Sequence, residues 1–292
     1  MKKIVLPALV VAVVAVAAWV YSQRERVVSP PSDEIAPTET PSPSAQTTTS
    51  AGTDTQAQSA RPSLADTQHL NRKVEITSIN LAKDWAQLQE TAKTDPAFAY
   101  ALVLKLFECK MVANTFGGIE KLNSKTVAAN QNASGLSDDI KAKAAVCADL
   151  TQTQYMAYVD MIEFAAASGV IKAQAEYSTF VAASLNMTPD IIKNPRVIDE
   201  YKAKSMRYYH SAAQSGYAPA LQNLSFAYSD GILTPKDDYA AYKYLLATNL
   251  AAARGSPSRD KLLVRFQSGL TPQQIASAQR EAIAIYNACC RK

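Results

Sequence analysis

From Leu70 onward, apolar residues recur at helical spacing, and no stretch alternates apolar and polar residues as a half-buried strand would. This pattern predicts an all-α fold. The run 98–112 is apolar over most of its circumference, so we expect that helix to be largely buried. The expected helices span residues 81–91, 98–112, 119–129, 138–151, 154–167, 171–185, 196–215, 218–229, 236–253, 257–267 and 275–287.

Three of the expected helices begin at recognisable capping residues. Asp95 is followed by Pro96, which combines a preferred N-cap residue with proline at the first helical position. Ser137 precedes two acidic residues, which suit the first turn of a helix. The segment 271–274 reads Thr-Pro-Gln-Gln and predicts a capping box. These signals fix the starts of three helices independently of the apolar pattern.

One short phrase occurs three times, each time at the end of an apolar helical run. It reads Ala-Ala-Ala-Ser-Gly at 165–169, Ala-Ala-Gln-Ser-Gly at 212–216 and Ala-Ala-Ala-Arg-Gly at 251–255. The small residues allow two helices to approach closely, and the glycine suits a left-handed turn after the helix. The glycines are 47 residues (169 to 216) and 39 residues (216 to 255) apart, which is typical of stacked helical hairpins.

The segment 202–255 resembles the Sel-one-like repeat, a relative of the tetratricopeptide repeat. The likeness is partial over 154–183 and is lost after Gly255. It implies an α-α superhelix, a short solenoid of helical hairpins with irregular capping helices, which binds partners and does not catalyse. Ser225 is a departure, because the family usually has glycine there; serine is still small enough for close helix packing. The matching residues are Ala212, Ala213, Gly216, Ala220, Leu224, Tyr228, Gly231, Asp237 and Ala241.

Residues 1–22 carry an export signal. Lys2 and Lys3 precede an uncharged apolar run, 4–21, whose length as a helix would be about 27 Å, close to the thickness of a bilayer core. The segment is either a retained anchor or a cleaved signal peptide, since Ala15-Val16-Ala17 resembles a cleavage site. The first alternative places the protein in a bacterial inner membrane, with a single pass and a periplasmic domain. The second makes it soluble in the periplasm or secreted.

Residues 23–68 are expected to be a disordered linker, and 69–292 the helical repeat domain. Between 29 and 63 there are six prolines and one large aliphatic residue, Ile35, with much Ser, Thr, Gln and Ala. Such a segment cannot bury enough apolar area to offset the entropy of ordering it. It would serve as a tether between the membrane and the domain.

All four cysteines lie in the part that would be exported, where an even number favours disulfides. Cys109 and Cys147 are the natural pair, because each lies in an apolar helical run and the segment between them is rich in turn residues. Two separately buried thiols are the alternative. The neighbouring Cys289 and Cys290 leave three possibilities open: free thiols, a vicinal ring or a bond between chains.

The sequence offers little support for catalysis, and no cofactor or metal is expected. There are only two histidines, His69 and His210, and His210 fits a structural or surface role better than a catalytic one. Known motifs for metal, nucleotide or nucleophilic chemistry do not occur in the sequence. We therefore expect no enzyme, with hydrolysis the least supported function. The net charge of +4 is spread without a basic block, so nucleic acid is not an expected partner.

Tyrosines supply the candidate binding residues. Eight of the 14 lie between 201 and 244, and most are expected to pack in the core with the hydroxyl hydrogen-bonded. Tyr208, Tyr209, Tyr242 and Tyr244 are candidates for a groove that binds a protein or peptide partner in the cell envelope. The alternative is a structural envelope factor that binds peptidoglycan, suggested by the long tether and the diffuse positive charge. The membrane itself would be contacted through the N-terminal segment.

Overall fold

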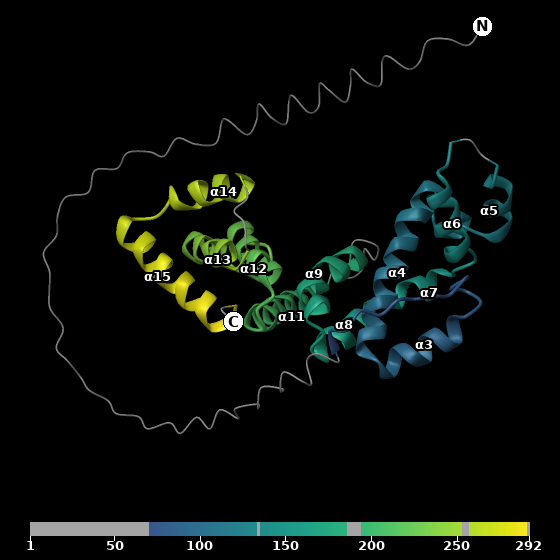
Figure 1. Ribbon diagram of the computed structural model, residues 1–292, viewed down its shortest axis with the longest axis horizontal. Helices are drawn as coiled ribbons and strands as arrows, with labels where there is room; N and C mark the ends of the chain where they lie inside the picture. Colours follow the sequence, from purple (N-terminus) through teal and green to yellow (C-terminus); the bar gives the residue numbers. More distant parts are fainter. Residues whose placement is uncertain (1–69, 133–134, 186–193, 253–256, 291–292) are drawn as a thin grey trace, which may run out of the picture. The chain divides into compact units, whose positions relative to one another are not determined.

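The computed structural model describes residues 70–132, 135–185, 194–252 and 257–290, and within these ranges the regular structure is helical, without a strand. The all-α prediction is therefore confirmed. The predicted apolar segment 1–22 and the linker 23–68 lie outside the described residues, and no helix within the described ranges is long and apolar enough to span a bilayer. The helices are α3 (Trp85–Thr94), α4 (Pro96–Thr115), η1 (Ile119–Lys121), α5 (Ser124–Asn130), α6 (Asp138–Cys147), α7 (Gln152–Met156), α8 (Tyr158–Ala167), α9 (Ile171–Leu185), α11 (Pro195–Gln214), α12 (Ala218–Asp230), α13 (Asp238–Ala251), α14 (Pro257–Gln267) and α15 (Pro272–Cys289) (Figure 1).

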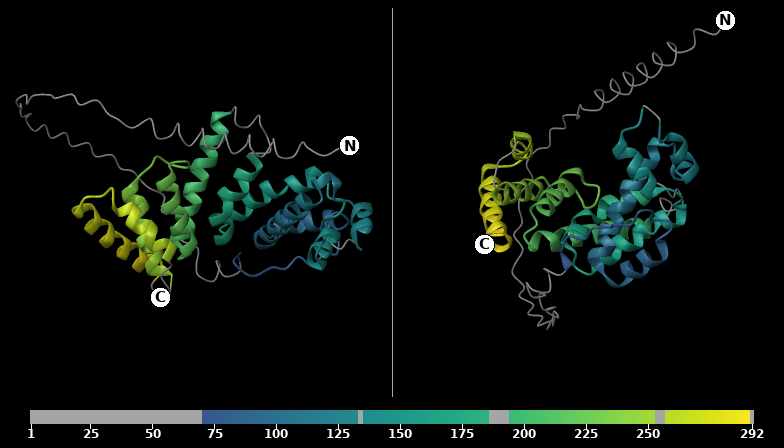
Figure 2. Two further views of the ribbon diagram at one scale, coloured as in Figure 1. Left: turned by 90° about the horizontal axis from the view of Figure 1, so that it is seen from above. Right: turned by 45° about the vertical axis from the view of Figure 1, so that its right-hand side comes forward.

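From α8 onward, the helices pack on one another in chain order. α8 packs on α9, α9 on α11, α11 on α12, and α12 on α13. The two views of Figure 2 show these helices side by side, in a row that ends with α14 and α15. α4 lies against α8, with α3 and α6 packed on α4. Each of these helices therefore buries its apolar residues against its neighbours.

The glycine turns appear where the repeated phrase predicts them. Gly169 separates α8 from α9 with a φ of 94°, and Gly216 separates α11 from α12 with a φ of 85°. Only glycine adopts this backbone region without steric cost. The third copy of the phrase ends at Gly255, which lies outside the described residues.

Ser225 confirms the close helix crossing expected at its position. The side chain is fully buried between α12 and α13, and its hydroxyl donates a hydrogen bond to the carbonyl oxygen of Ala241 at 2.8 Å. Ala241 is itself fully buried. A small side chain at this crossing lets the two backbones approach, and the serine satisfies its own hydroxyl in doing so.

The capping predictions are also confirmed. The Asp95 carboxylate accepts hydrogen bonds from the N–H groups of Ala97 and Phe98, each at 3.1 Å. At the start of α15, the Thr271 hydroxyl accepts from the Gln274 N–H at 3.3 Å, while the Gln274 amide oxygen accepts from the Thr271 N–H at 2.9 Å. These are the reciprocal bonds of a capping box.

Several helices differ from the expected boundaries; the expected helix 119–129, for example, is divided into η1 and α5. The expected helix 154–167 is divided into α7 and α8 at Ala157. The expected helix 138–151 ends at Cys147, because Ala148 is extended and Asp149 has a φ of 67°. The N–H of Asp149 donates to the carbonyl oxygen of Leu122 at 3.0 Å, so a long-range contact replaces the helical one. The local sequence carries no sign of that contact.

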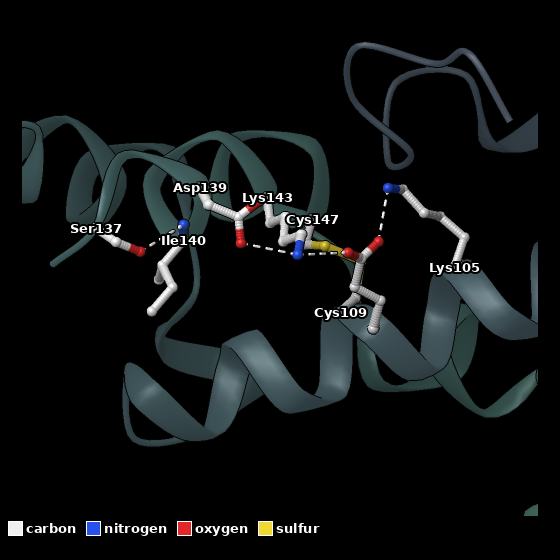
Figure 3. A network of polar contacts seen from close by, with 8 residues as sticks. Lys105, Cys109, Ser137, Asp139, Ile140, Lys143 and Cys147 are labelled. Carbon is white, nitrogen blue, oxygen red and sulfur yellow. Dashed lines mark hydrogen bonds and ion pairs between the residues drawn. A yellow bond between two sulfur atoms is a disulfide. The ribbon is translucent and has the colours of Figure 1, made fainter.

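A disulfide and an ion-pair network join α4 to α6 (Figure 3). The structure bonds Cys109 to Cys147, in agreement with the predicted pairing, across a Cα–Cα distance of 5.3 Å. Beside the bond, the Glu108 carboxylate accepts from Lys105 at 2.7 Å and pairs with Lys143 at 3.2 Å. Burial opposes ionisation of Glu108, but these two ammonium groups outweigh it and lower its pKa. The disulfide restrains the long connection between the two helices.

Candidate partner-binding pocket

A small pocket of about 180 Å³ lies where α11, α12, α13 and α15 meet; we call it the α11–α15 pocket. Its floor is apolar and comes from α12, whose Leu221 and Leu224 are fully buried. α11 supplies two polar side chains, and α13 and α15 supply the remaining wall. The lining residues are His210, Ala213, Gln214, Leu221, Leu224, Tyr244, Ile285, Ala288 and Cys289.

The return of α15 completes this pocket. α15 packs along α13, and its C-terminal end reaches α11 (Figure 1). The carbonyl group of Cys289 lies so close to Gly216 that a Cβ atom placed on this glycine would be 2.7 Å from the carbonyl oxygen. Gly216 thus has two roles: it permits the left-handed turn between α11 and α12, and it makes room for the end of α15.

Two aromatic rings form one wall of the pocket. The rings of His210 and Tyr244 meet edge to face with centroids 6.0 Å apart. Tyr244 is stacked in turn on Tyr228, with centroids 5.7 Å apart and an interplanar angle of 3°. The ammonium group of Lys243 lies 5.3 Å from the centre of the Tyr244 ring, at a distance typical of a cation–π contact. Packing on both sides therefore fixes the position of Tyr244.

His210 is held in its neutral form by its surroundings. Burial lowers the pKa of His210 below its ordinary value of 6.5, and the positive charge on Lys243 lowers it further. A neutral imidazole has one N–H donor and one acceptor nitrogen. Within the residues that the structure describes, the His210 ring has the contact with Tyr244 and no hydrogen bond. Its nitrogens are therefore available to a molecule in the pocket.

The two adjacent cysteines are bonded to each other. Cys289 and Cys290 form a vicinal disulfide, so the structure selects one of the three possibilities left open by the sequence. Both residues are half-buried, and Cys289 contributes to the pocket wall. The bond gives the pocket a sulfur-containing edge that is polarisable and apolar.

The predicted groove of four tyrosines is wrong in this form. Tyr208, Tyr209 and Tyr242 are 5%, 6% and 3% exposed, so a partner at the surface cannot lie against their rings. They are core residues, packed between neighbouring helices. Of the four, Tyr244 lines one of the hollows described here, the α11–α15 pocket. The helical spacing alone did not reveal which tyrosines faced inward, because that depends on the helices packed around them.

Two tyrosine hydroxyls are satisfied by glutamates on other helices, which explains why these two buried rings are tyrosines. Tyr208 donates to Glu163 on α8 at 3.3 Å, and Lys204 pairs with the same carboxylate at 2.9 Å. Tyr100 on α4 donates to Glu176 on α9 at 2.8 Å. These bonds join helices that are not consecutive in the chain, α8 to α11 and α4 to α9, and they stabilise the stack.

The residues that match the repeat pattern have packing or capping roles in the structure. Gly231 ends α12 in the left-handed conformation with a φ of 72°, and the Asp237 carboxylate caps α13 by accepting from the Ala240 N–H at 2.9 Å. Tyr228 is half-buried and stacked on Tyr244. The other matching residues form the buried contacts between helices: Ala212, Ala213, Ala220, Leu224 and Ala241.

Sequence reasoning missed most of the pocket. Gln214, Ile285 and Ala288 carried no signal, because each looks like an ordinary residue of an amphipathic helix. For His210 the sequence predicts a structural or surface role. These residues come together only through the return of α15 over α13, which no local pattern encodes.

Two other hollows are less suited to specific binding. One of about 550 Å³ lies over the loop between α12 and α13 and is lined largely by turn residues such as Thr234, Pro235 and Lys236. Another, of about 270 Å³, lies between α3 and α8 beside Met161 and Phe164. Neither brings aromatic rings and an unbonded imidazole together as the α11–α15 pocket does.

Chemically, the α11–α15 pocket can bind a small apolar group and hydrogen-bond it through His210 or Gln214. Among the described residues, no cluster of three or more His, Cys, Asp or Glu side chains could hold a metal ion.

Comparison with known proteins gives no match: no family model, no curated protein and no solved structure matches this chain.

Proposed function

We propose that this chain is an exported, non-catalytic interaction module that is tethered at the cell envelope and binds a protein or peptide partner. The stacked hairpins would form a short superhelix of the Sel-one-like type, and residues 1–22 and 23–68 would serve as anchor and tether. The observation that carries the proposal is the α11–α15 pocket, an apolar hollow with the His210 ring at its wall, formed where α11, α12, α13 and α15 meet. Helical repeats commonly bind their partners through such surfaces.

The size of the pocket supports a macromolecular partner over a free metabolite. Sites for drug-sized molecules usually have volumes of about 300–1,000 Å³. The α11–α15 pocket, at about 180 Å³, has room for one side chain, so further contacts have to come from the surrounding helix surfaces. A side chain anchored in a pocket, surrounded by weaker contacts, is the usual anatomy of a protein interface.

Site-specific photo-crosslinking in native membranes tests this proposal. A photoreactive residue at Gln214, which is exposed at the pocket rim, should give a discrete adduct with one protein. The same residue at Ala142, exposed on α6, a helix that does not line the pocket, is the matched control and should not. Equal adducts at both positions, or none at either, would contradict the proposal. Sedimentation with purified cell-wall sacculi in the absence of a protein adduct would favour the peptidoglycan alternative.

A further inference from the structure

We propose that the α11–α15 pocket binds one aromatic ring that carries a hydroxyl group, supplied by a tyrosine side chain of the partner. The volume gives the first argument. A cavity of about 150 Å³ lined by apolar side chains takes up benzene. The α11–α15 pocket, at about 180 Å³, can hold a single ring with one small substituent, and an indole or a larger ligand would not fit.

The chemistry of the wall favours an aromatic ring over an aliphatic group. The wall contains two rings, those of His210 and Tyr244, and a sulfur-bearing residue, Cys289. Aromatic pairs gain from edge-to-face or offset packing, and sulfur makes favourable contacts with ring edges. Leu221 and Leu224 are fully buried beneath the pocket and make its surroundings apolar, so a bound ring would contact the less buried His210, Tyr244, Ile285 and Cys289.

A hydroxyl on the ring would meet a suitable partner at the pocket wall. The His210 imidazole, which is half-buried and has no hydrogen bond within the described part of the chain, can accept from a phenol or donate to it. The Gln214 side chain, which is exposed at the rim, offers a second donor and acceptor. Phenylalanine would fill the same space but leave the imidazole unpaired, so tyrosine should bind more tightly.

This inference rests on the proposed function only for the source of the ring. Occupancy of the pocket can be measured without any partner, with p-cresol as the probe for a tyrosine side chain and toluene as the probe for phenylalanine. If p-cresol binds but no partner is crosslinked, the proposed function fails and the pocket assignment stands. If a partner is crosslinked but p-cresol does not bind, the proposed function stands and the pocket assignment fails.

The experiment uses the full-length chain in lipid nanodiscs, with carbon-13 in the histidine rings. The chain has two histidines, so two ring signals are expected, and His210→Phe identifies the signal of His210. We expect p-cresol to shift the His210 signal saturably and to leave that of His69 in place. Toluene should bind about three- to tenfold more weakly, the loss expected for one hydrogen bond. An unshifted His210 signal would overturn the assignment, and toluene binding as tightly as p-cresol would overturn the role of the hydroxyl.

A pocket-filling variant provides a second, independent test. Ala288 is exposed on α15 and lines the pocket, so Ala288→Leu should fill part of the pocket without disturbing the core. We expect p-cresol binding, measured by saturation transfer, to weaken at least about tenfold. Ala284→Leu adds the same side chain at an exposed position outside the pocket and should bind as the unsubstituted chain does. Unchanged binding by Ala288→Leu would contradict the proposed location.

Discussion

Replacing Gly216 with alanine tests whether the end of α15 is docked as the structure describes. The substitution makes two changes at once. It places an alanine at a φ of 85°, and it adds a Cβ atom 2.7 Å from the carbonyl oxygen of Cys289. Real Cβ atoms essentially never come this close to another heavy atom, and the neighbouring atom belongs to the backbone. Either the turn or the end of α15 has to move.

The size of the effect follows from the two parts. A left-handed conformation costs an L residue about 1–2 kcal/mol relative to glycine. Displacing the α15 terminus resembles overpacking of a core, which typically costs a further 1–3 kcal/mol, or about 2–5 kcal/mol in all. Gly169→Ala is the matched control, because its φ is 94° but its Cβ would meet, among the described residues, only a Leu70 side-chain atom at 3.7 Å. The free energy of unfolding of Gly169→Ala should fall only by the cost of the left-handed conformation, about 1–2 kcal/mol.

The assay is urea unfolding of the full-length chain, followed by circular dichroism, together with hydrogen exchange resolved by peptide. Gly216→Ala should unfold at lower urea than Gly169→Ala, and its peptides from the end of α15 should exchange faster. The control should leave exchange at the α15 terminus unchanged. Equal destabilisation by the two substitutions, with no local effect on α15, would refute the docking described here.

Three further predictions concern the disulfide, the helix crossing and the pH dependence. Replacing Cys109 and Cys147 together by alanine should lower the free energy of unfolding by about 4 kcal/mol, because the disulfide closes a loop with a sequence separation of 38. The shift in the urea midpoint measures this loss, and a loss below about 1 kcal/mol would contradict the prediction. Ser225→Leu should lower the free energy of unfolding by more than about 1 kcal/mol, because leucine overpacks the space between α12 and α13. Ser225→Ala should lose no more than the free energy of one hydrogen bond. If calorimetry shows Ser225→Ala to be the less stable variant, the close crossing is refuted. Because the pKa of His210 is lowered by folding, the unfolded chain binds more protons just below pH 6.5, so stability should fall as pH drops through that window. Lys243→Gln should raise the midpoint of the His210 titration seen by NMR, and an unchanged midpoint would show that the charge on Lys243 does not act on the ring.

Local features of this fold could be predicted from the sequence because local chemistry determines them. The caps at Asp95 and Thr271 depend on residues within one turn, and the turn at Gly216 depends on a backbone conformation that glycine favours. The small residue at Ser225 follows from the same logic at a helix crossing. Each of these predictions concerns a contact between neighbours in sequence or a simple limit on side-chain size.

The site could not be predicted, because it depends on contacts between distant segments. The tyrosine pattern in α11 and α13 does not say which rings face another helix, and Tyr208 and Tyr242 are both buried. The end of the helix at Cys147 depends on a bond from Asp149 to the distant Leu122. The α11–α15 pocket exists only because α15 crosses α13 and ends against Gly216.

The most direct test of the account combines the pocket with the partner. The yield of the crosslinked adduct from Gln214 should be measured in native membranes for the unsubstituted chain, for Ala288→Leu and for Ala284→Leu. If the chain binds a partner through the α11–α15 pocket, Ala288→Leu abolishes most of the adduct and Ala284→Leu leaves it intact. An adduct that persists undiminished in Ala288→Leu would contradict partner binding through this pocket.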